Sequence, residues 1–348
     1  MKTAAYAAAT SRAPLAPMMI DRRDPGPDDV VIDILFSGIC HSDIHQARSE
    51  WGPALFPMVP GHEIVGRVSA VGANVKKLVV GDLAGVGCMV DSCRTCEPCA
   101  EDHEQFCEAG TAWTYNGTEM DRKTPTFGGY AQHIVVRERF AAKVPAGLDP
   151  ASAAPLMCAG ITTYSPLVQW GCKAGTRVGV VGLGGLGHMG VKIAAAMGAE
   201  VTMLSTSASK AADAQRLGAA HFALTSDRAQ MKPLARHFDL IINTVSAQHD
   251  YGDYLRLLRP YGVMAVVGVP PEKVPVSANA LINGNKRLAG SSIGGMAETQ
   301  QMLEFCATHK LGADVEVIAA KQINEAYERT IKGDVRYRFS IDASTFAS

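Results

Sequence analysis

Four cysteines lie close together in one stretch of the chain, at Cys93, Cys96, Cys99 and Cys107. Zinc prefers four soft ligands in a tetrahedron, and gaps of two residues let a tight loop direct successive thiolates at one ion. A shell of four thiolates is closed, so it leaves no position for water or a substrate. The spacing therefore predicts a structural zinc site in the loop 93–107. An iron–sulfur cluster and four unligated thiols are the alternatives.

A second set of candidate metal ligands is spread along the chain. Cys40, His62 and Cys158 supply two thiolates and one imidazole, the ligand set of a catalytic zinc with an open fourth position. Zinc bound there would act as a Lewis acid on an alcohol or carbonyl oxygen. Glu63 follows a ligand directly and could fill the open position when no substrate is bound. Each residue taken alone could equally be a core cysteine or a hydrogen-bonded histidine.

A glycine-rich loop follows a predicted strand and opens a predicted helix, which is the context of a dinucleotide-binding loop. Gly182 permits the tight turn, Gly184 lets the backbone approach a pyrophosphate, and Gly187 allows close packing of helix on strand. The phosphates would lie at the positive N-terminus of the helix. The loop residues expected to contact the dinucleotide are Gly182, Leu183, Gly184, Gly185, Leu186 and Gly187.

The residues after the next predicted strand favour NADP over NAD. An NAD site holds the ribose 2′-hydroxyl with an Asp or Glu about 20 residues after the loop, but no acid directly follows the strand Val201–Leu204. Hydroxyls and a lysine beside a helix start would instead receive a 2′-phosphate. Simple capping of the helix is the alternative. The candidate phosphate ligands are Ser205, Thr206, Ser207 and Lys210.

Polar residues after Cys40 indicate a path for the proton of an alcohol substrate. Ser42 and His45 would lie near one pocket if a turn enters a helix at this point. A hydroxyl can pass the proton from the substrate oxygen, through the cofactor ribose, to an imidazole that reaches solvent. Asp43 is suited to accept the second ring N–H of His62 and to fix its tautomer. Helix N-capping is the alternative role of Ser42 and Asp43.

The elements that must position these residues follow two patterns along the chain. Residues 1–145 read as short strands broken by Gly and Pro, such as Val30–Phe36 and Glu63–Val71, which indicates a β-rich, barrel-like unit. From about Thr176, strands alternate with helices, which indicates a parallel sheet with helices on both faces. The strands predicted there are Arg177–Val181, Val201–Leu204, Phe238–Val245 and Val263–Val269, and the helices are Leu186–Met197, Ser209–Leu217 and Tyr251–Leu258. The last part is predicted as strand Leu288–Ile293, helices Ala297–His309 and Asn324–Ile331, and strand Tyr337–Asp342.

Length and charge limit the classes of protein. A chain of 348 residues is longer than one hydrophobic core usually grows, so two domains are expected. The net charge of −1 gives no electrostatic case for nucleic acid or an anionic membrane. The longest apolar stretches are strand-length, far short of the roughly 20 residues of a membrane span. Met1–Ala9 has no long apolar region of a signal peptide, so a cytoplasmic protein is predicted.

Nine cysteines in such a chain indicate metal binding or catalysis rather than disulfides. Six of them belong to the two zinc sets above. The remaining three, Cys88, Cys172 and Cys306, stand in apolar or helical contexts, and we expect them to be buried core residues.

Together these motifs resemble the zinc-dependent medium-chain alcohol dehydrogenases, and within them the cinnamyl alcohol dehydrogenase-like group with its bacterial NADP-dependent aldehyde reductases. The resemblance covers nearly the whole chain. Its most specific motifs are CHSDIH at Cys40, PGHEIVGRV at Pro60, the cysteine loop, WTYN at Trp113, LMCAGITTYSPL at Leu156, VGLGGLGHMGVK at Val181 and DVRYRFSID at Asp334.

The resemblance implies an α/β protein with two Zn²⁺ ions per chain. Residues 1–149 would form a GroES-like, β-rich catalytic domain that includes the structural zinc loop. Residues 150–287 would form a Rossmann domain, a doubly wound parallel sheet that binds NADP(H). Residues 288–348 would return to complete the catalytic domain. The family also implies a homodimer that forms through the Rossmann domains.

Further site residues follow from the resemblance alone. The additional cofactor contacts would be His41, Thr162, Thr244, Val267, Gly268, Ser291, Ser292, Ile293 and Arg338. Trp51 and Trp113 would line the substrate pocket. Plant cinnamyl enzymes typically carry phenylalanine where Ser292 stands, and the loop Arg48–Phe56 also differs. We therefore expect broad reduction of aromatic and medium aliphatic aldehydes to primary alcohols.

Two other functions are compatible with parts of this pattern. One is a zinc-free quinone reductase of the same superfold, and the other is an NADPH-binding protein that has lost catalysis. Both predict a missing metal ligand or relay residue, and this sequence lacks none of them.

Overall fold

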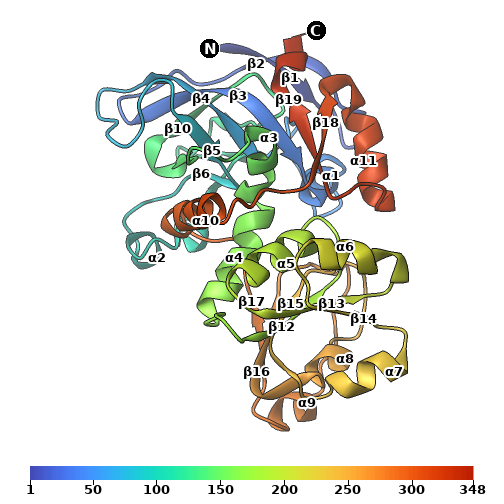
Figure 1. The fold of residues 1–348 in the computed structure, drawn as a ribbon. Helices are drawn as coiled ribbons and strands as arrows, with labels where there is room; N and C mark the ends of the chain where they lie inside the picture. The colour runs from blue at the N-terminus through green and yellow to red at the C-terminus, as the bar shows by residue number, and fades with distance from the viewer. Residues whose placement is uncertain (348) are drawn as a thin grey trace. The chain divides into compact units, whose positions relative to one another are not determined.

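The computed structural model describes residues 1–347, which form two compact units (Figure 1). The first unit contains Met1–Cys158 and the chain from Gly294 onward, and the second contains Ala159–Ile293. The boundaries expected from the family resemblance were 149/150 and 287/288. The first unit reaches further because residues 150–157 pack on its own sheet. The second unit extends past residue 287 because the strand Arg287–Gly290 pairs at the edge of its sheet.

The first unit is built on a seven-stranded sheet. Its strands are β3 (Asp29–Ile39), β4 (Ile64–Val71), β5 (Leu83–Val86), β10 (His133–Arg137), β11 (Ala142–Lys143), β18 (Val315–Ala319) and β19 (Arg338–Asp342). Strand β3 is long enough to pair with β10 along its first half and with β19 along its second half. In Figure 1 the red C-terminal strand β19 lies beside the blue strand β3. The end of the chain therefore completes a sheet that begins near its start.

Smaller elements surround this sheet. Three antiparallel pairs are formed by β1 (Lys2–Ala7) with β2 (Ala16–Asp21), β6 (Met89–Asp91) with β7 (Ala112–Trp113), and β8 (Gly117–Thr118) with β9 (Pro125–Thr126). The helices are α1 (His41–Ala47), α2 (Glu97–Ala100), α3 (Pro150–Ala153), α10 (Met296–Thr308) and α11 (Ile323–Lys332). Short 3₁₀ turns are η1 (Glu104–Phe106), η2 (Glu138–Phe140), η3 (Ala154–Met157), η6 (Ala320–Gln322) and η7 (Ala343–Ala347).

Helix α11 shows how local sequence sets an element and its orientation. Its buried residues, Ile323, Ala326, Tyr327 and Thr330, follow the three- and four-residue spacing of one helical face. The helix ends at Gly333, whose φ of 67° is the left-handed conformation that glycine adopts most easily. The buried face places the side chain of Tyr327 inside the first unit.

The second unit is a parallel sheet of six strands in the spatial order β14-β13-β12-β15-β16-β17. Numbered along the chain, this order is 3-2-1-4-5-6, the doubly wound Rossmann topology. The strands are β12 (Arg177–Val181), β13 (Glu200–Ser205), β14 (His221–Leu224), β15 (Phe238–Asn243), β16 (Leu258–Val266) and β17 (Arg287–Gly290). The helices are α4 (Ala159–Gln169), α5 (Gly187–Ala196), α6 (Ala211–Arg216), α7 (Arg228–Met231), α8 (Tyr251–Leu255) and α9 (Ala278–Ile282), with 3₁₀ turns η4 (Ala208–Lys210) and η5 (Lys232–Leu234).

The alternating pattern of the second unit was predicted from the sequence, but strands β14 and β16 differ from the prediction. Strand β14 was missed because it is a short edge strand that begins with the exposed His221. Strand β16 begins at Leu258, where the sequence predicted the end of a helix. Its first half contains Pro260 and an exposed Tyr261, so it lacks the continuous apolar run of a central strand.

Within residues 1–347, no helix is both long enough and apolar enough to cross a lipid bilayer.

Candidate active site

Four potential metal ligands from distant parts of the chain meet in the first unit. Cys40, His62, Glu63 and Cys158 each offer a donor atom, these atoms all lie within 4.8 Å of one another, and all four residues are buried. Strand β3 ends directly before Cys40, the loop before β4 carries His62 and Glu63, and the turn η3 delivers Cys158. The structure thus brings together the whole second ligand set that the sequence predicts.

Asp43 connects three of the segments around this cluster. Its Oδ1 accepts hydrogen bonds from His62 Nδ1 at 2.9 Å and from the Gly61 amide at 3.1 Å. Its Oδ2 accepts from the Cys40 amide at 2.8 Å and from the Tyr130 hydroxyl at 3.2 Å. The carboxylate is fully buried. Because His62 donates from Nδ1, its Nε2 is left as the unprotonated nitrogen that can bind a metal.

Asp43 also caps helix α1, which was the alternative role predicted for it from the sequence. Asp43 is the third residue of α1, and its bond from the Cys40 amide satisfies a donor at the start of that helix. The same carboxylate therefore caps α1 and orients a metal-ligand histidine.

The charge pattern of the cluster favours a thiolate at Cys40. A hydrogen bond from the Cys158 thiol holds the pKa of Cys40 well below its usual range, against the opposing effect of burial, and the positive charge of Arg338 lowers it further. Thiolate is the form of cysteine that binds zinc. The donor set of this cluster therefore fits a zinc ion.

Glu63 and Arg338 form a buried ion pair beside these ligands. Arg338 Nη2 donates to Glu63 Oε1, and the two side chains are 0% and 4% exposed, respectively. Burial raises the pKa of Glu63 to about 7, and the Arg338 charge opposes that effect. Oε2 of Glu63 is buried and has no hydrogen-bond partner within residues 1–347. An unpartnered carboxylate oxygen among thiolates and imidazole is further support for a cation at this place.

The four cysteines of the loop 93–107 also converge. Their sulfur atoms all lie within 4.8 Å of one another. The Cys93 amide donates to Cys107 Sγ, and the Cys96 amide donates to Cys93 Sγ, each at 3.3 Å. Hydrogen bonds from the Thr95 and Cys96 backbone amides lower the pKa of Cys93 to about 5. Backbone amides directed at clustered sulfurs stabilise thiolates, so this shell fits a closed zinc site. All nine cysteines are free of disulfides.

Ser42 and His45 lie on one side of α1, one turn apart. Ser42 Oγ lies 3.7 Å from the sulfur of Cys40. The His45 side chain is 31% exposed, its Nδ1 lies 2.5 Å from Glu50 Oε2, and its ring stacks on Trp51 with centroids 4.8 Å apart. Glu50 was not predicted from the sequence. The available signal was an acidic residue five positions after a histidine in a predicted helix, which is close enough to pair with it. Trp51 and Trp113 are 50% and 43% exposed, respectively.

Cys88 is a second residue near the metal-ligand cluster that sequence reasoning missed. A hydrogen bond with Cys158 lowers the pKa of the Cys88 thiol, which places the two side chains next to each other. The chain before it packs closely on the turn that precedes Cys158, since a Cβ at Gly87 would lie 2.8 Å from the carbonyl oxygen of Met157. Cys306 is buried as expected, whereas Cys88 and Cys172 are partly exposed.

The glycine loop of the second unit meets the three demands of a dinucleotide site. Gly182 has a φ of 89°, and a Cβ at Gly187 would lie 1.8 Å from the Gly182 carbonyl oxygen. A Cβ at Gly184 would meet nothing within 4 Å, so this position opens to free space. The loop therefore has a glycine for the turn, one for close packing, and one that leaves room for a ligand at the start of α5.

The segment after β13 gathers the predicted phosphate ligands. The Ser207 amide donates to Ser205 Oγ at 3.2 Å, and the hydroxyls of Ser207 and Ser209 lie 2.9 Å apart. Lys210 Nζ donates to the carbonyl oxygen of Leu183 at 2.6 Å, which ties this segment to the glycine loop. Ser209 was not predicted. Thr206 is exposed and Ser205 is buried at the end of β13.

The other predicted cofactor contacts of the second unit lie mostly after the ends of β15, β16 and β17. Thr244 Oγ1 donates to the carbonyl oxygen of Val181 at 2.8 Å, at the point where the strand order reverses. Val267 and Gly268 donate backbone hydrogen bonds to Asn243, a buried polar residue that sequence reasoning missed. The carboxyl ends of parallel strands at such a switch point form the usual ligand site of this topology. Ser291, Ser292 and Ile293 follow β17, Thr162 is buried in α4, and His41 and Arg338 belong to the first unit.

Comparison with known proteins identifies the family to which the chain is similar. Residues 26–146 match the family described as alcohol dehydrogenase GroES-like domain, and residues 185–308 match the family described as zinc-binding dehydrogenase. The chain is 53% identical to NADP-dependent alcohol dehydrogenase C of Mycobacterium tuberculosis over 98% of each chain. It is 51% identical to aldehyde reductase YahK of Escherichia coli over 99% of each. The structure of a cinnamyl alcohol dehydrogenase from Sorghum bicolor (SbCAD4) superposes with a TM-score of 0.96 at 45% identity, covering 99% of this chain and 98% of that one.

Proposed function

Because the chain belongs to the zinc-dependent alcohol dehydrogenase family, we propose that it transfers a hydride between NADP(H) and a primary alcohol or aldehyde. The observation that carries this proposal is the buried cluster of Cys40, His62 and Cys158, with Asp43 on the remote nitrogen of His62. The enzyme is an NADP-dependent alcohol dehydrogenase or aldehyde reductase. The quinone reductase and the inactive NADPH-binding protein are disfavoured because every ligand of the cluster is in place.

Two zinc ions are held by separate parts of the first unit. Cys40, His62 and Cys158 hold the catalytic ion, which when bound supplies a Lewis acid for the substrate oxygen. Glu63 is the alternate ligand, supported by its unpartnered Oε2. Its ion pair with Arg338 holds the carboxylate beside the cluster. The four cysteines of the loop 93–107 hold the structural ion.

The proton of the reaction moves along the side of α1. Ser42, next to Cys40, exchanges a proton with the substrate oxygen, and His45 exchanges it with solvent. Glu50 holds the ring of His45 through Nδ1, which orients the imidazole. Both residues lie on one helix, so their separation does not depend on any other element.

The second unit binds NADP(H). Its glycine loop takes the pyrophosphate, and Ser205, Thr206, Ser207 and Lys210 take the 2′-phosphate. Thr162, Thr244, Val267, Gly268 and the residues 291–293 contact the rest of the cofactor, and His41 and Arg338 are further candidates for its phosphates. Arg338 has the weaker support, because its guanidinium is already paired with Glu63.

The substrates are aromatic and medium aliphatic aldehydes, which Trp51 and Trp113 contact through half-exposed aromatic faces.

The enzyme forms a homodimer through the second unit in the cytoplasm and has no nucleic-acid or membrane partner. In support, β17 is an edge strand, and Val269 and Ile282 expose 63% and 73% of their surface in that unit.

Metal analysis combined with a substrate panel tests the proposal. The purified protein should contain two zinc ions per chain and oxidise NADPH in the presence of benzaldehyde-type and medium-chain aldehydes, followed by absorbance. Cys158→Ala should lose one zinc and all turnover but keep its fold. Cys99→Ala should instead impair folding, because structural zinc binding is coupled to folding. One zinc or none in the unmodified protein, or iron in the cysteine loop, would overturn the assignment.

A further inference from the structure

A loop that contains no metal ligand lies directly behind the segment that carries His62. We call residues 127–130 the backing loop. Its Gly128, Gly129 and Tyr130 amides donate to the carbonyl oxygens of Val59, Gly61 and Pro60 at 2.7, 2.8 and 3.0 Å, respectively. These bonds tie the backing loop to the three residues that immediately precede His62.

The two segments pack closely because each contributes glycine to the contact, Gly61 on one side and Gly128 and Gly129 on the other. A Cβ at Gly128 would lie 2.3 Å from the Pro60 carbonyl oxygen, and one at Gly129 would lie 2.3 Å from Ile64 Cγ1. Distances this short leave no room for any side chain. A shift of the backing loop must therefore move the chain on both sides of His62.

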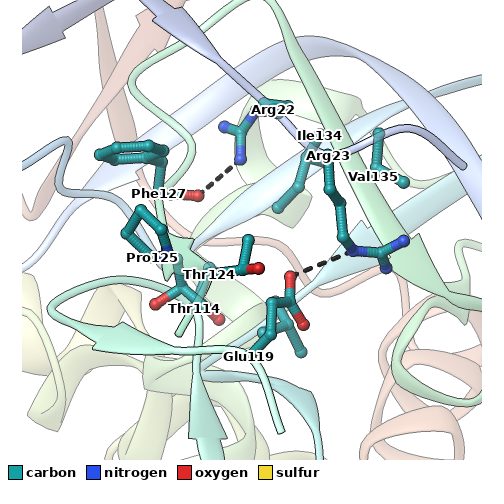
Figure 2. A pocket seen from close by; sticks show the side chains of 11 residues that line it. Arg22, Arg23, Thr114, Glu119, Thr124, Pro125, Phe127, Ile134 and Val135 are labelled. Atoms are coloured by element: carbon teal, nitrogen blue, oxygen red, sulfur yellow. Dashed lines mark hydrogen bonds and ion pairs between the residues drawn. The ribbon is translucent and has the colours of Figure 1, made fainter. Parts of the chain in front are cut away.

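Arg22 holds the backing loop from the other side. It follows strand β2, and its Nη1 and Nη2 donate to the carbonyl oxygens of Phe127 and Gly128, each at 2.7 Å; Figure 2 shows the bond to Phe127. Arg22 is only 9% exposed, and its Nε has no hydrogen-bond partner within residues 1–347. Burial lowers the pKa of Arg22 to about 9, so the side chain is still a cation at neutral pH. Burying a guanidinium costs folding free energy, and its two bonds here go to backbone carbonyls of the backing loop.

Tyr130 links the backing loop to the ligands by a second route. Its ring is fully buried, and its hydroxyl donates to Asp43 Oδ2, the oxygen that also accepts the Cys40 amide. Tyr327 of α11 lies next to it, with its hydroxyl oxygen 3.5 Å from that of Tyr130. The hydroxyl of Tyr130 shares the Asp43 carboxylate with donors from Cys40, Gly61 and His62, and the side chain of Tyr115 also hydrogen-bonds to it.

We propose that Arg22 and Tyr130 are positioning residues of the catalytic metal centre, although neither is one of its ligands. Arg22 fixes the backing loop, and the backing loop fixes the backbone on both sides of His62. Tyr130 fixes Asp43, and Asp43 fixes the ring of His62 and the backbone of Cys40. The inference rests on the proposed function, because it takes Cys40, His62 and Cys158 as the zinc ligands.

Two substitutions remove these contacts with little change in volume. Tyr130→Phe keeps the ring and removes the hydroxyl, and Arg22→Met keeps a long side chain and removes both bonds to the backing loop. Loss of a direct outer partner of a metal-ligand histidine weakens metal binding 10- to 100-fold in general. Tyr130 and Arg22 act one contact further out, so the lower end of this range applies to them. We expect about tenfold for each variant at the catalytic site, with the structural zinc unaffected.

The experiment measures metal binding and ligand geometry directly. The catalytic zinc is exchanged for Co²⁺, whose visible absorption bands report the arrangement of its ligands, and metal affinity is measured by competition with a chelator. Tyr254→Phe and Arg177→Met are controls outside the first unit, since Tyr254 is buried in the second unit and Arg177 pairs with Asp239 there. Arg22→Lys is the conservative variant, because lysine reaches one carbonyl but lacks the fork that binds two.

The expected result is weaker metal binding, shifted Co²⁺ bands and a lower kcat in Tyr130→Phe and Arg22→Met, with KM for NADPH unchanged. Arg22→Lys should recover part of the affinity. The inference is overturned if Tyr130→Phe and Arg22→Met match the unmodified protein in affinity and spectrum. It is also overturned if both zinc ions are lost together, since that indicates general damage. A single metal ion in the unmodified protein would refute the proposed function instead, before any variant is compared.

Discussion

Asp43→Asn is the substitution for which the structure allows the most detailed prediction. An amide has one oxygen and one NH₂ group, whereas the carboxylate of Asp43 accepts two hydrogen bonds on each oxygen. Placing the NH₂ group at the Oδ1 position would set it against two donors, His62 Nδ1 and the Gly61 amide. Placing it at the Oδ2 position is less costly, because the Tyr130 hydroxyl can rotate to accept. The Cys40 amide is then left without an acceptor.

The size of the effect follows from these lost bonds. An unsatisfied buried N–H costs about 1–3 kcal/mol, and replacing a charge-assisted bond to His62 by a neutral one costs about 1 kcal/mol more. We therefore expect Asp43→Asn to lower the free energy of unfolding by about 2–4 kcal/mol. Zinc affinity at the catalytic site should fall about 10- to 100-fold, because the ring of His62 is held less firmly.

The chain contains a matched control for this prediction. Asp33 Oδ1 lies 2.9 Å from His133 Nδ1, the same distance as in the Asp43–His62 pair, but the two side chains are 50% and 34% exposed. Asp33→Asn should change stability by no more than about 1 kcal/mol, since solvent replaces the lost bond. Urea denaturation followed by tryptophan fluorescence, with chelator competition for zinc, measures both variants. Equal stabilities and equal zinc affinities for Asp43→Asn and Asp33→Asn would refute the reasoning.

Three further predictions concern the second unit. The unmodified enzyme should prefer NADPH over NADH by roughly a hundredfold in kcat/KM, and Ser205→Asp combined with Lys210→Ala should erase or reverse that preference; similar values for both cofactors in the unmodified enzyme would contradict it. Gly187→Ala should destabilise the unit, because its Cβ would lie 1.8 Å from the Gly182 carbonyl oxygen, whereas Gly184→Ala should leave thermal stability unchanged and weaken NADPH binding. Burial raises the pKa of Cys172 to about 11, so at pH 8 about one Cys172 thiol in a thousand is ionised. Because the thiolate is the reactive form, alkylation of Cys172 by iodoacetamide should be about a hundredfold slower than for a thiol of pKa 9. Mass spectrometry measures the rate. The rate should rise about tenfold per pH unit up to pH 10, and a flat profile would show that this thiol is not protected by burial.

Features that depend on neighbouring residues were predictable from the sequence. The four cysteines of the loop 93–107 and the glycines of the loop 182–187 act through spacings of a few residues, and a short loop has few ways to arrange them. Ser42 and His45 share one helix for the same reason. The alternation of strands and helices after residue 176 was predictable from the sequence, because central parallel strands appear as continuous apolar runs. The Rossmann strand order then agrees with the usual rules for such units.

Contacts between distant segments were decided only by the tertiary structure. Nothing near Arg338 in the sequence indicates that it pairs with Glu63, and this contact exists because β19 lies antiparallel to β3. Likewise, the bonds of Arg22 to the backing loop, and of Tyr130 to Asp43, depend on how the loops between strands pack. An arginine or a buried tyrosine has many possible partners of suitable chemistry. The residue type limits the kind of bond, but the partner is selected by distance, and distances between remote residues are set by strand pairing and packing.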